Sequence, residues 1–229
     1  MKLYNFAFGP YPQRVNIYLA EKTPAGIERI ILDAPTGKGK WPPDEIAALS
    51  LTGSLPIIVD GDGTVVTQSL AILEYIEDTR PEPNMRGHTA ATRARTRQLV
   101  AVFDEAMDAF ALWGRYGSDL GGHDKDTHRE VIKIGSERYF QKIQLAEKMI
   151  GDTEFLTGET VTIADCVAMA MLQYSLTFFD VPIPPDCVRL QRWYDRFAKR
   201  PSAAAGAFPL EQRSIARHLM RQTNVALPK

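Results

Sequence analysis

The sequence predicts a small α/β domain followed by an all-helical domain. In the first 80 residues strand patterns and helix patterns alternate, whereas after residue 88 only helical periodicity continues. The segment Arg80–His88 between them is polar and rich in Pro and Gly, which is typical of a linker. We therefore expect one domain over residues 1–80 and a second over residues 89–229.

The first half begins with a strand, a turn and a helix. Aromatic and polar side chains alternate over Lys2–Ala7, which predicts a strand. A Gly-Pro-Tyr-Pro turn precedes a helix predicted over Gln13–Lys22, and Pro12 suits the first turn because a backbone N–H has no partner there. Arg14 and Glu21 are expected to lie outside the buried face of this helix.

Three more strands and two more helices complete the first half. A strand is predicted over Ile27–Leu32 and a short helix over Asp44–Leu49. The strands Leu55–Asp60 and Thr64–Thr67 flank a Gly-Asp-Gly turn, which strongly favours a hairpin. A helix over Ser69–Asp78 follows. The order β-α-β-α-β-β-α joins a parallel βαβ unit to an antiparallel hairpin, which is the thioredoxin-like arrangement.

The second half is helical throughout, with no internal repeat. Its apolar residues recur at helical spacing, and turn residues separate the helices. The predicted helices are Thr89–Gly117, Lys125–Ile150, Ile163–Phe179, Arg189–Lys199 and a last one within Pro209–Gln222.

Composition excludes several classes of protein. The formal net charge of -1 indicates no overall basic field for nucleic acid or an acidic membrane. No run approaches about 18 consecutive apolar residues, so no membrane span is expected. The two cysteines form no C-x-x-C, no signal-peptide pattern is present, and the four histidines show no ligand spacing. We expect a cytoplasmic protein without disulfides or a metal.

Two short motifs twelve residues apart carry the chemical signal. Leu55-Pro56 heads an apolar strand, where a cis proline would turn the preceding N–H and C=O outward to bind an extended peptide. A trans proline that merely starts the strand is the alternative. Gln68-Ser69 stands where a strand meets a helix, whose free N–H groups favour a carboxylate. Alternatively, Ser69 simply caps that helix.

The stretch Gly53–Glu77 resembles the glutathione transferase pattern of Gly-x-Val/Leu-Pro, apolar strand, Asp-Gly hairpin and Glu/Gln-Ser-x-Ala-Ile helix. Gly158–Asp165 is similar to the family's Gly-x-x-x-Ser/Thr-x-Ala-Asp segment, in which Thr162 and Asp165 have the spacing of a capping box. Arg200-Pro201-Ser202 also resembles the family, so the resemblance covers nearly the whole chain.

The resemblance implies the glutathione transferase fold and glutathione as a co-substrate. By it, Leu55 and Pro56 bind the cysteinyl backbone of glutathione, and Gln68 and Ser69 bind its γ-glutamyl end. It places Lys40 and Trp41 near the glycine carboxylate, although a surface lysine without a specific role remains an alternative. It also implies a homodimer and a role in detoxification.

The motifs above do not identify the residue that stabilises the thiolate of glutathione. Six residues before Val15, where many family members carry Ser or Cys, this chain has Gly9. A thiol with a pKa of about 8.5 needs about 2.7 kcal/mol of thiolate stabilisation to lower that pKa by about 2. We expect Tyr11 to be the catalytic donor, together with backbone N–H groups near Gln13. A packing role for Tyr11 is the alternative.

An apolar, possibly aromatic electrophile is the expected second substrate. The hydrophobic substrate site is assigned to side chains between the domains: Phe8, Tyr11, Met107, Phe110 and Trp113. The last three fall at helical spacing, and an aromatic stripe of this kind is more often part of a core than of a pocket.

Two other functions remain open at this stage. One is a glutathione-dependent reductase that cleaves an ether or a disulfide. The other is a non-catalytic module of the same fold that binds a partner or an apolar ligand.

Overall fold

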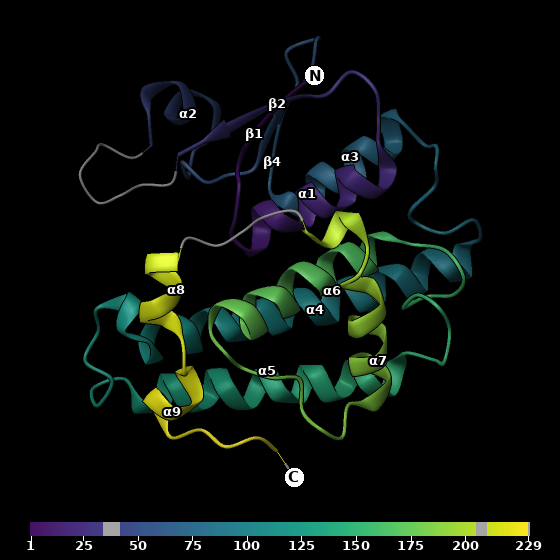
Figure 1. The fold of residues 1–229 in the computed structure, drawn as a ribbon. Coiled ribbons are helices and arrows are strands. Elements are labelled where there is room, and N and C mark those ends of the chain that lie inside the picture. Colours follow the sequence, from purple (N-terminus) through teal and green to yellow (C-terminus); the bar gives the residue numbers. More distant parts are fainter. Residues whose placement is uncertain (34–41, 205–209, 229) are drawn as a thin grey trace.

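A four-stranded sheet forms the first half of the molecule. The computed structural model describes residues 1–33, 42–204 and 210–228 (Figure 1). The strands are β1 (Lys2–Phe6), β2 (Glu28–Leu32), β3 (Ile57–Val59) and β4 (Val65–Thr67), in the order β2-β1-β3-β4. β1 runs parallel to β2, and the pairs β1/β3 and β3/β4 are antiparallel. The mixed sheet confirms the predicted βαβ unit joined to a hairpin.

Alternation along the strands places helices on both faces of the sheet. Leu3 and Ile58 face the main core with α1 (Pro10–Lys22) and α3 (Ser69–Thr79). Tyr4 and Ile57 point to the other face, where they pack with Ile46 of α2 (Asp44–Leu49). As a result, α1 and α3 lie between the sheet and the helical half (Figure 1).

The helical half is built around one central helix. Ten of the eleven residues of α6 (Ile163–Gln173) are buried, as expected for a helix that is apolar on every side. It packs against α1 and against α4, which pairs closely with α5. The remaining elements are α4 (Ala90–Gly117), η1 (Asp119–Gly121), α5 (Arg129–Met149), the π-helical segment η2 (Tyr174–Phe178), α7 (Val188–Phe197), η3 (Pro201–Ala204), α8 (Leu210–Ala216) and α9 (Leu219–Thr223).

The predicted two-part fold class is confirmed, and four details differ. α1 begins at Pro10, because two prolines fit its first turn. Arg14, expected outside the buried face, is buried because α4 supplies a carboxylate for it. The helix predicted over Ile163–Phe179 gives way to a π-helical segment after Gln173. The last predicted helix is two short ones, α8 and α9.

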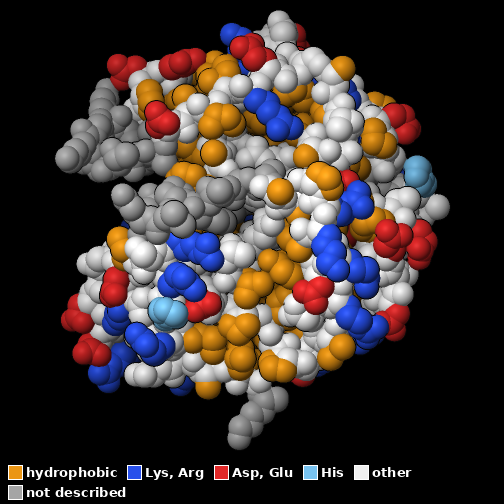
Figure 2. Space-filling model, viewed as in Figure 1, with side chains coloured by type: hydrophobic (Ala, Val, Ile, Leu, Met, Phe, Trp, Pro, Cys, Tyr) orange, Lys and Arg blue, Asp and Glu red, His pale blue; other side chains and the backbone are white. Residues whose placement is uncertain are grey.

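The surface is mixed in character. On the face in Figure 2, Lys and Arg side chains lie beside Asp and Glu side chains over the helical half. In the described part of the chain, no helix has both the length and the apolar character needed to cross a membrane. The face seen in this view therefore presents both signs of charge, in keeping with the net charge of -1.

Asp165 organises the start of α6 from a fully buried position. Its Oδ2 accepts hydrogen bonds from the N–H and the hydroxyl of Thr162, at 2.9 and 3.0 Å. Its Oδ1 accepts from the Leu156 N–H and from Trp193 Nε1, both at 2.9 Å. Burial raises the pKa of Asp165, and the four donors oppose that rise. The predicted capping box is thus confirmed, and it also joins α7 and the preceding loop to α6.

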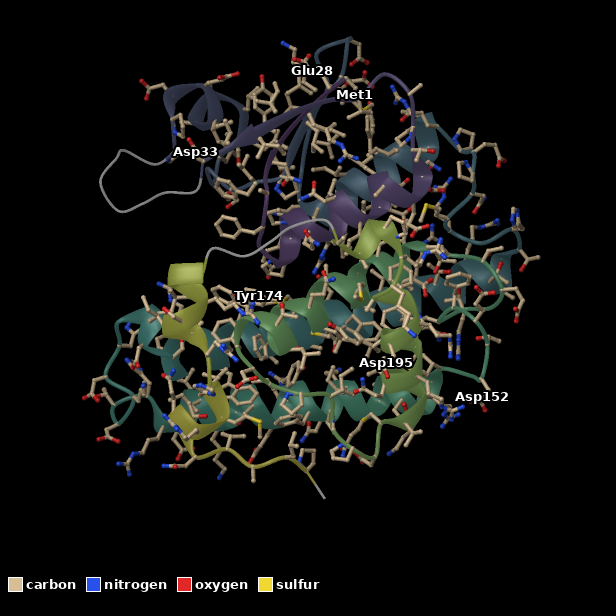
Figure 3. The ribbon with its side chains drawn as sticks, viewed as in Figure 1. Met1, Glu28, Asp33, Asp152, Tyr174 and Asp195 are labelled. Atoms are coloured by element: carbon tan, nitrogen blue, oxygen red, sulfur yellow. The ribbon has the colours of Figure 1, made fainter. Side chains whose placement is uncertain are left out.

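We predict that Asp165→Ala lowers the free energy of unfolding by about 3 kcal/mol or more, because it leaves several buried donors without an acceptor. The measurement is urea denaturation followed by circular dichroism. Asp152→Ala is the control: that carboxylate is exposed (Figure 3) and makes only a surface ion pair with Arg192, worth at most about 1 kcal/mol. Equal losses in the two variants would contradict this role for Asp165.

Candidate functional site

A cavity of about 450 Å³ lies between the sheet half and α4. One wall comes from α1, the loop before β3 and the β4–α3 junction, and the opposite wall comes from α4. Five of the residues singled out from the sequence line it together: Tyr11, Leu55, Pro56, Gln68 and Ser69. The other lining residues are Arg14, Thr52, Ser54, Thr67, Leu70, Asp104 and Asp108.

Leu55 presents an unpaired backbone to this cavity. The ladder between β1 and β3 ends at the pair Tyr4 and Ile57, so Leu55 lies beyond it. No hydrogen bond joins the Leu55 N–H or C=O to another residue in the described ranges. The Leu55-Pro56 peptide bond is cis, so the alternative of a trans proline is wrong. A free N–H and C=O at the end of a strand can bind an extended peptide.

The N-terminus of α3 opens on the same cavity. Gln68 is the N-cap residue, in a backbone conformation with φ of 70°, and its side chain makes no capping hydrogen bond. Ser69 is therefore the first helical residue, and its role is not that of a simple cap. The first intrahelical bond runs from the Ile72 N–H to the Gln68 carbonyl at 3.0 Å. The earlier N–H groups of the helix are thus free to bind an anion.

The α4 wall carries a cluster of charged side chains. Arg14 Nη1 lies 2.7 Å from Asp104 Oδ1, and the Arg14 Cζ lies 5.0 Å from the centre of the Tyr11 ring. Burial, followed by the charge of Asp108, raises the pKa of Tyr11, so the phenol stays protonated and can donate. Burial and the charge of Asp104 raise the pKa of Asp108.

The start of α1 holds few backbone donors. Gly9 is the N-cap, and Pro10 and Pro12 have no N–H. The Gln13 N–H donates to the Gly9 carbonyl at 2.9 Å, so the expectation of free donors near Gln13 is wrong. In the first turn of α1, Tyr11 is left as the residue that offers both a backbone N–H and a hydroxyl.

The remaining assigned residues lie elsewhere. Lys40 and Trp41 fall outside the described residues. Phe8 is half-buried and stacks on Phe6, with ring centres 6.5 Å apart. Met107 and Trp113 are buried in the main core, and Trp113 Nε1 donates to Thr223 Oγ1 at 3.1 Å. Their burial supports the core interpretation of the aromatic stripe on α4.

A second cavity of about 430 Å³ follows along α4. Phe110, although buried, forms part of its wall with Tyr174, which lies on the side of the helices that faces the sheet (Figure 3). It is lined by Phe110, Ala111, Gly114, Arg115, Leu120, Gly121, Tyr174 and Phe179. Its walls are mostly aromatic or aliphatic, in contrast to the charged first cavity.

Sequence reasoning missed Arg14, Asp104 and Asp108. A usable signal was present, because two carboxylates four residues apart lie on one face of a helix. Nothing local marks Arg14 as their partner, since the pairing joins α1 to α4 across 90 residues of sequence.

The two halves are clamped by polar contacts of α1. Glu21 accepts two hydrogen bonds from Arg200, both at 2.7 Å, and another from the Ser202 hydroxyl. Gln13 Nε2 donates to Gln173 Oε1 at 3.2 Å. Together with the Arg14–Asp104 pair, these contacts hold the sheet wall of the first cavity against its α4 wall.

Neither cysteine is among the described residues that line this site. Burial raises the pKa of Cys166 well above its ordinary value and raises that of Cys187 to about 12, so both stay thiols. Within residues 1–33, 42–204 and 210–228, no three His, Cys, Asp or Glu side chains gather as metal ligands.

Comparison with known proteins shows one family over most of the chain. Residues 8–79 match the family model for the glutathione S-transferase N-terminal domain, and residues 110–201 match the model for its C-terminal domain. Glutathione S-transferase 2 of Saccharomyces cerevisiae is 24% identical over 206 residues, which covers 88% of this chain and 87% of that protein.

Two further relatives carry other names. FtsZ-localized protein A of Caulobacter vibrioides is 28% identical over 215 residues, covering 87% of each chain. Maleylacetoacetate isomerase of Pseudomonas aeruginosa is 27% identical over 207 residues, covering 88% of this chain and 93% of that one.

Solved structures agree in fold. A glutathione S-transferase domain-containing protein of Marinobacter aquaeolei superposes with a TM-score of 0.75 at 26% identity, over 89% of this chain and 100% of that one. A glutathione S-transferase of Methylobacillus flagellatus with GSH bound has a TM-score of 0.76 at 19% identity, over 90% and 99%.

The Glu21 clamp predicts a pH dependence of stability. Burial raises the pKa of Glu21, but hydrogen bonds from Arg200 and Ser202 outweigh it and hold the pKa below its ordinary value of 4.5. A carboxylate whose pKa is depressed by folding stabilises the fold above its unfolded pKa, and the stabilisation disappears as pH falls through the folded pKa. Glu21→Gln should therefore lower the free energy of unfolding by about 1–3 kcal/mol at pH 7, and by less at each step below pH 4.5.

Denaturant unfolding measured between pH 7 and pH 3 tests this expectation. Glu28→Gln is the matched control, because Glu28 is exposed on β2 (Figure 3). A Glu21→Gln deficit that stays constant with pH would show that the charge of Glu21 is not what stabilises the interface.

Proposed function

Because the chain belongs to the glutathione S-transferase family, we propose that it is an enzyme that uses the thiolate of glutathione to attack an apolar electrophile. The observation that carries this proposal is the convergence of Leu55, Gln68, Ser69 and Tyr11 on one cavity. A peptide-binding backbone, a helix N-terminus for a carboxylate and a phenol donor are the groups that the tripeptide requires.

Glutathione would lie along the sheet wall. Its γ-glutamyl carboxylate would sit at the α3 N-terminus, where free N–H groups and the Ser69 hydroxyl favour an anion. Its cysteinyl backbone would pair with the unpaired N–H and C=O of Leu55. This placement points the sulfur toward Tyr11 at the start of α1.

Tyr11 would stabilise the thiolate. Its raised pKa keeps the phenol protonated, so it can donate to sulfur, and its backbone N–H lies in the same turn of α1. A charge-assisted hydrogen bond is worth about 1.5–3 kcal/mol, which is comparable to the about 2.7 kcal/mol required. We place the electrophile in the second cavity, whose aromatic and aliphatic lining suits an apolar molecule.

A second candidate function is a non-catalytic module that binds a partner. Gly9 at the position where many family members carry Ser or Cys favours it, and one relative is named for localisation rather than for catalysis. Binding to glutathione resin discriminates between the two. Failure to bind at millimolar glutathione would remove the enzyme proposal, whereas retention without turnover of any electrophile, peroxide or mixed disulfide would favour the module.

A homodimer is part of the proposal. It rests on membership of the family, since a single exposed apolar side chain such as that of Leu51 is ordinary on a protein surface. Sedimentation as a 25.6 kDa species at micromolar concentration would contradict a dimer.

Ser69→Ala is expected to weaken glutathione binding about tenfold, because it removes a donor to the γ-glutamyl carboxylate. Isothermal titration with glutathione measures the change. Ser214→Ala, on the exposed side of α8 and away from the cavity, is the matched control. Unchanged affinity in Ser69→Ala would place the γ-glutamyl end elsewhere.

Tyr11→Phe is expected to lower kcat at least about tenfold while glutathione affinity changes little, since only the donor to sulfur is lost. The pKa of the bound thiol, followed by thiolate absorbance, should rise in the same variant. Tyr75→Phe is the control, because its hydroxyl donates to Asp60 at 2.7 Å, away from the lining of the cavity. A normal rate in Tyr11→Phe would assign thiolate stabilisation to another group.

A further inference from the structure

The two cavities lie in series along one face of α4. Asp104 and Asp108 line the first cavity, and Ala111 and Arg115 line the second. These positions are spaced by four, three and four residues, so they share one face of the helix. Asp108 and Ala111 are separated by about 4.5 Å of helix rise, so molecules in the two cavities would be near neighbours.

The second cavity is shaped by aromatic rings. Phe110 and Phe179 meet edge to face at 5.1 Å, and Tyr174 meets Phe179 in the same way at 5.0 Å. Gly114 lets Phe179 approach the α4 backbone, because a Cβ there would lie 3.0 Å from the Phe179 Cζ. Such walls favour a flat apolar molecule, whose rings can contact the ring edges and faces.

One cation, Arg115, borders this apolar space. It is exposed, and its side chain makes no ion pair or hydrogen bond with residues 1–33, 42–204 or 213–228, whose side chains the structure describes. The acidic residue one turn along, Asp119, is engaged by Lys125, with Nζ and Oδ1 2.5 Å apart. Among the described residues that line the second cavity there is no Asp or Glu. A guanidinium in this setting is suited to a planar anion such as a carboxylate or a sulfonate.

We propose that the second cavity binds a flat aromatic molecule that carries one carboxylate or sulfonate group, which pairs with Arg115. The identification of this molecule as the second substrate rests on the proposed function, whereas its binding to the cavity requires no glutathione. The substrate class is thereby narrowed from apolar electrophiles to aromatic acids.

Two fluorescent probes distinguish the contribution of the anionic group to binding from that of the aromatic rings. Anilinonaphthalene sulfonate carries an anion, and N-phenylnaphthylamine has nearly the same rings without a charge. Both should bind the wild-type protein in the absence of glutathione. Arg115→Gln should weaken binding of the sulfonate about five- to tenfold and leave the neutral probe unchanged. Arg138→Gln, which removes an exposed cation of α5 outside the cavity lining, should change neither.

A variant that fills the second cavity tests whether both probes bind there. Ala111→Phe, at a lining position that is not fully buried, should reduce the binding of both probes, and thermal unfolding checks that the variant folds. The proposal is overturned if wild type binds neither probe, if Arg115→Gln affects both probes alike or neither, or if Ala111→Phe leaves them bound. If the wild-type protein binds the probes as expected but does not bind glutathione, the proposed function is contradicted and this inference about the second cavity stands.

Discussion

The burial of α1 is the constraint on which the rest of the structure depends. This helix lies between the sheet and the helical half, so several of its polar side chains, among them Arg14 and Lys22, are removed from water and pair with groups in the protein. Arg14 finds Asp104 on α4, and Lys22 finds Glu77 on α3, with Nζ and Oε1 2.9 Å apart. Each pairing joins α1 to another element, and the first of them links the two walls of the first cavity.

The same helix also decides which chemistry is available at that cavity. Prolines on both sides of Tyr11 remove two N–H groups that would otherwise point out of the first turn. At this end of α1, Tyr11 is therefore the residue that can stabilise an anion with both its backbone N–H and its hydroxyl. By contrast, α3 keeps its first N–H groups free beside Ser69. The sheet wall consequently contains one donor-rich end and one donor-poor end.

What the sequence predicted well is what short stretches of chain determine. The strands and most helices follow from local turn and capping chemistry, and their positions agree with the structure except at the start of α1, after Gln173 and near the C-terminus. The assignment of Leu55 and Ser69 to the sheet wall came from the resemblance to the family, because local chemistry alone left other interpretations open. The α4 wall could not be found in this way. Arg14 was expected at the surface because helical periodicity describes a single helix, whereas its burial depends on Asp104, which lies 90 residues away. The assignments of Lys40 and Trp41 remain predictions.

The single helix α4 lines both cavities. It contributes carboxylates to the first and mostly apolar residues to the second. Because α4 spans 28 residues without a break, the carboxylates of the first cavity and the apolar lining of the second keep a constant separation. Under the proposed function, the sheet wall would hold the peptide while residues 110–121 and the π-helical segment would contact the second substrate. Such a separation is compatible with relatives that are named as a transferase and as an isomerase. Under the proposed function, specificity would depend on the far end of α4, where Arg115 is the one charged residue among the described residues that line the second cavity.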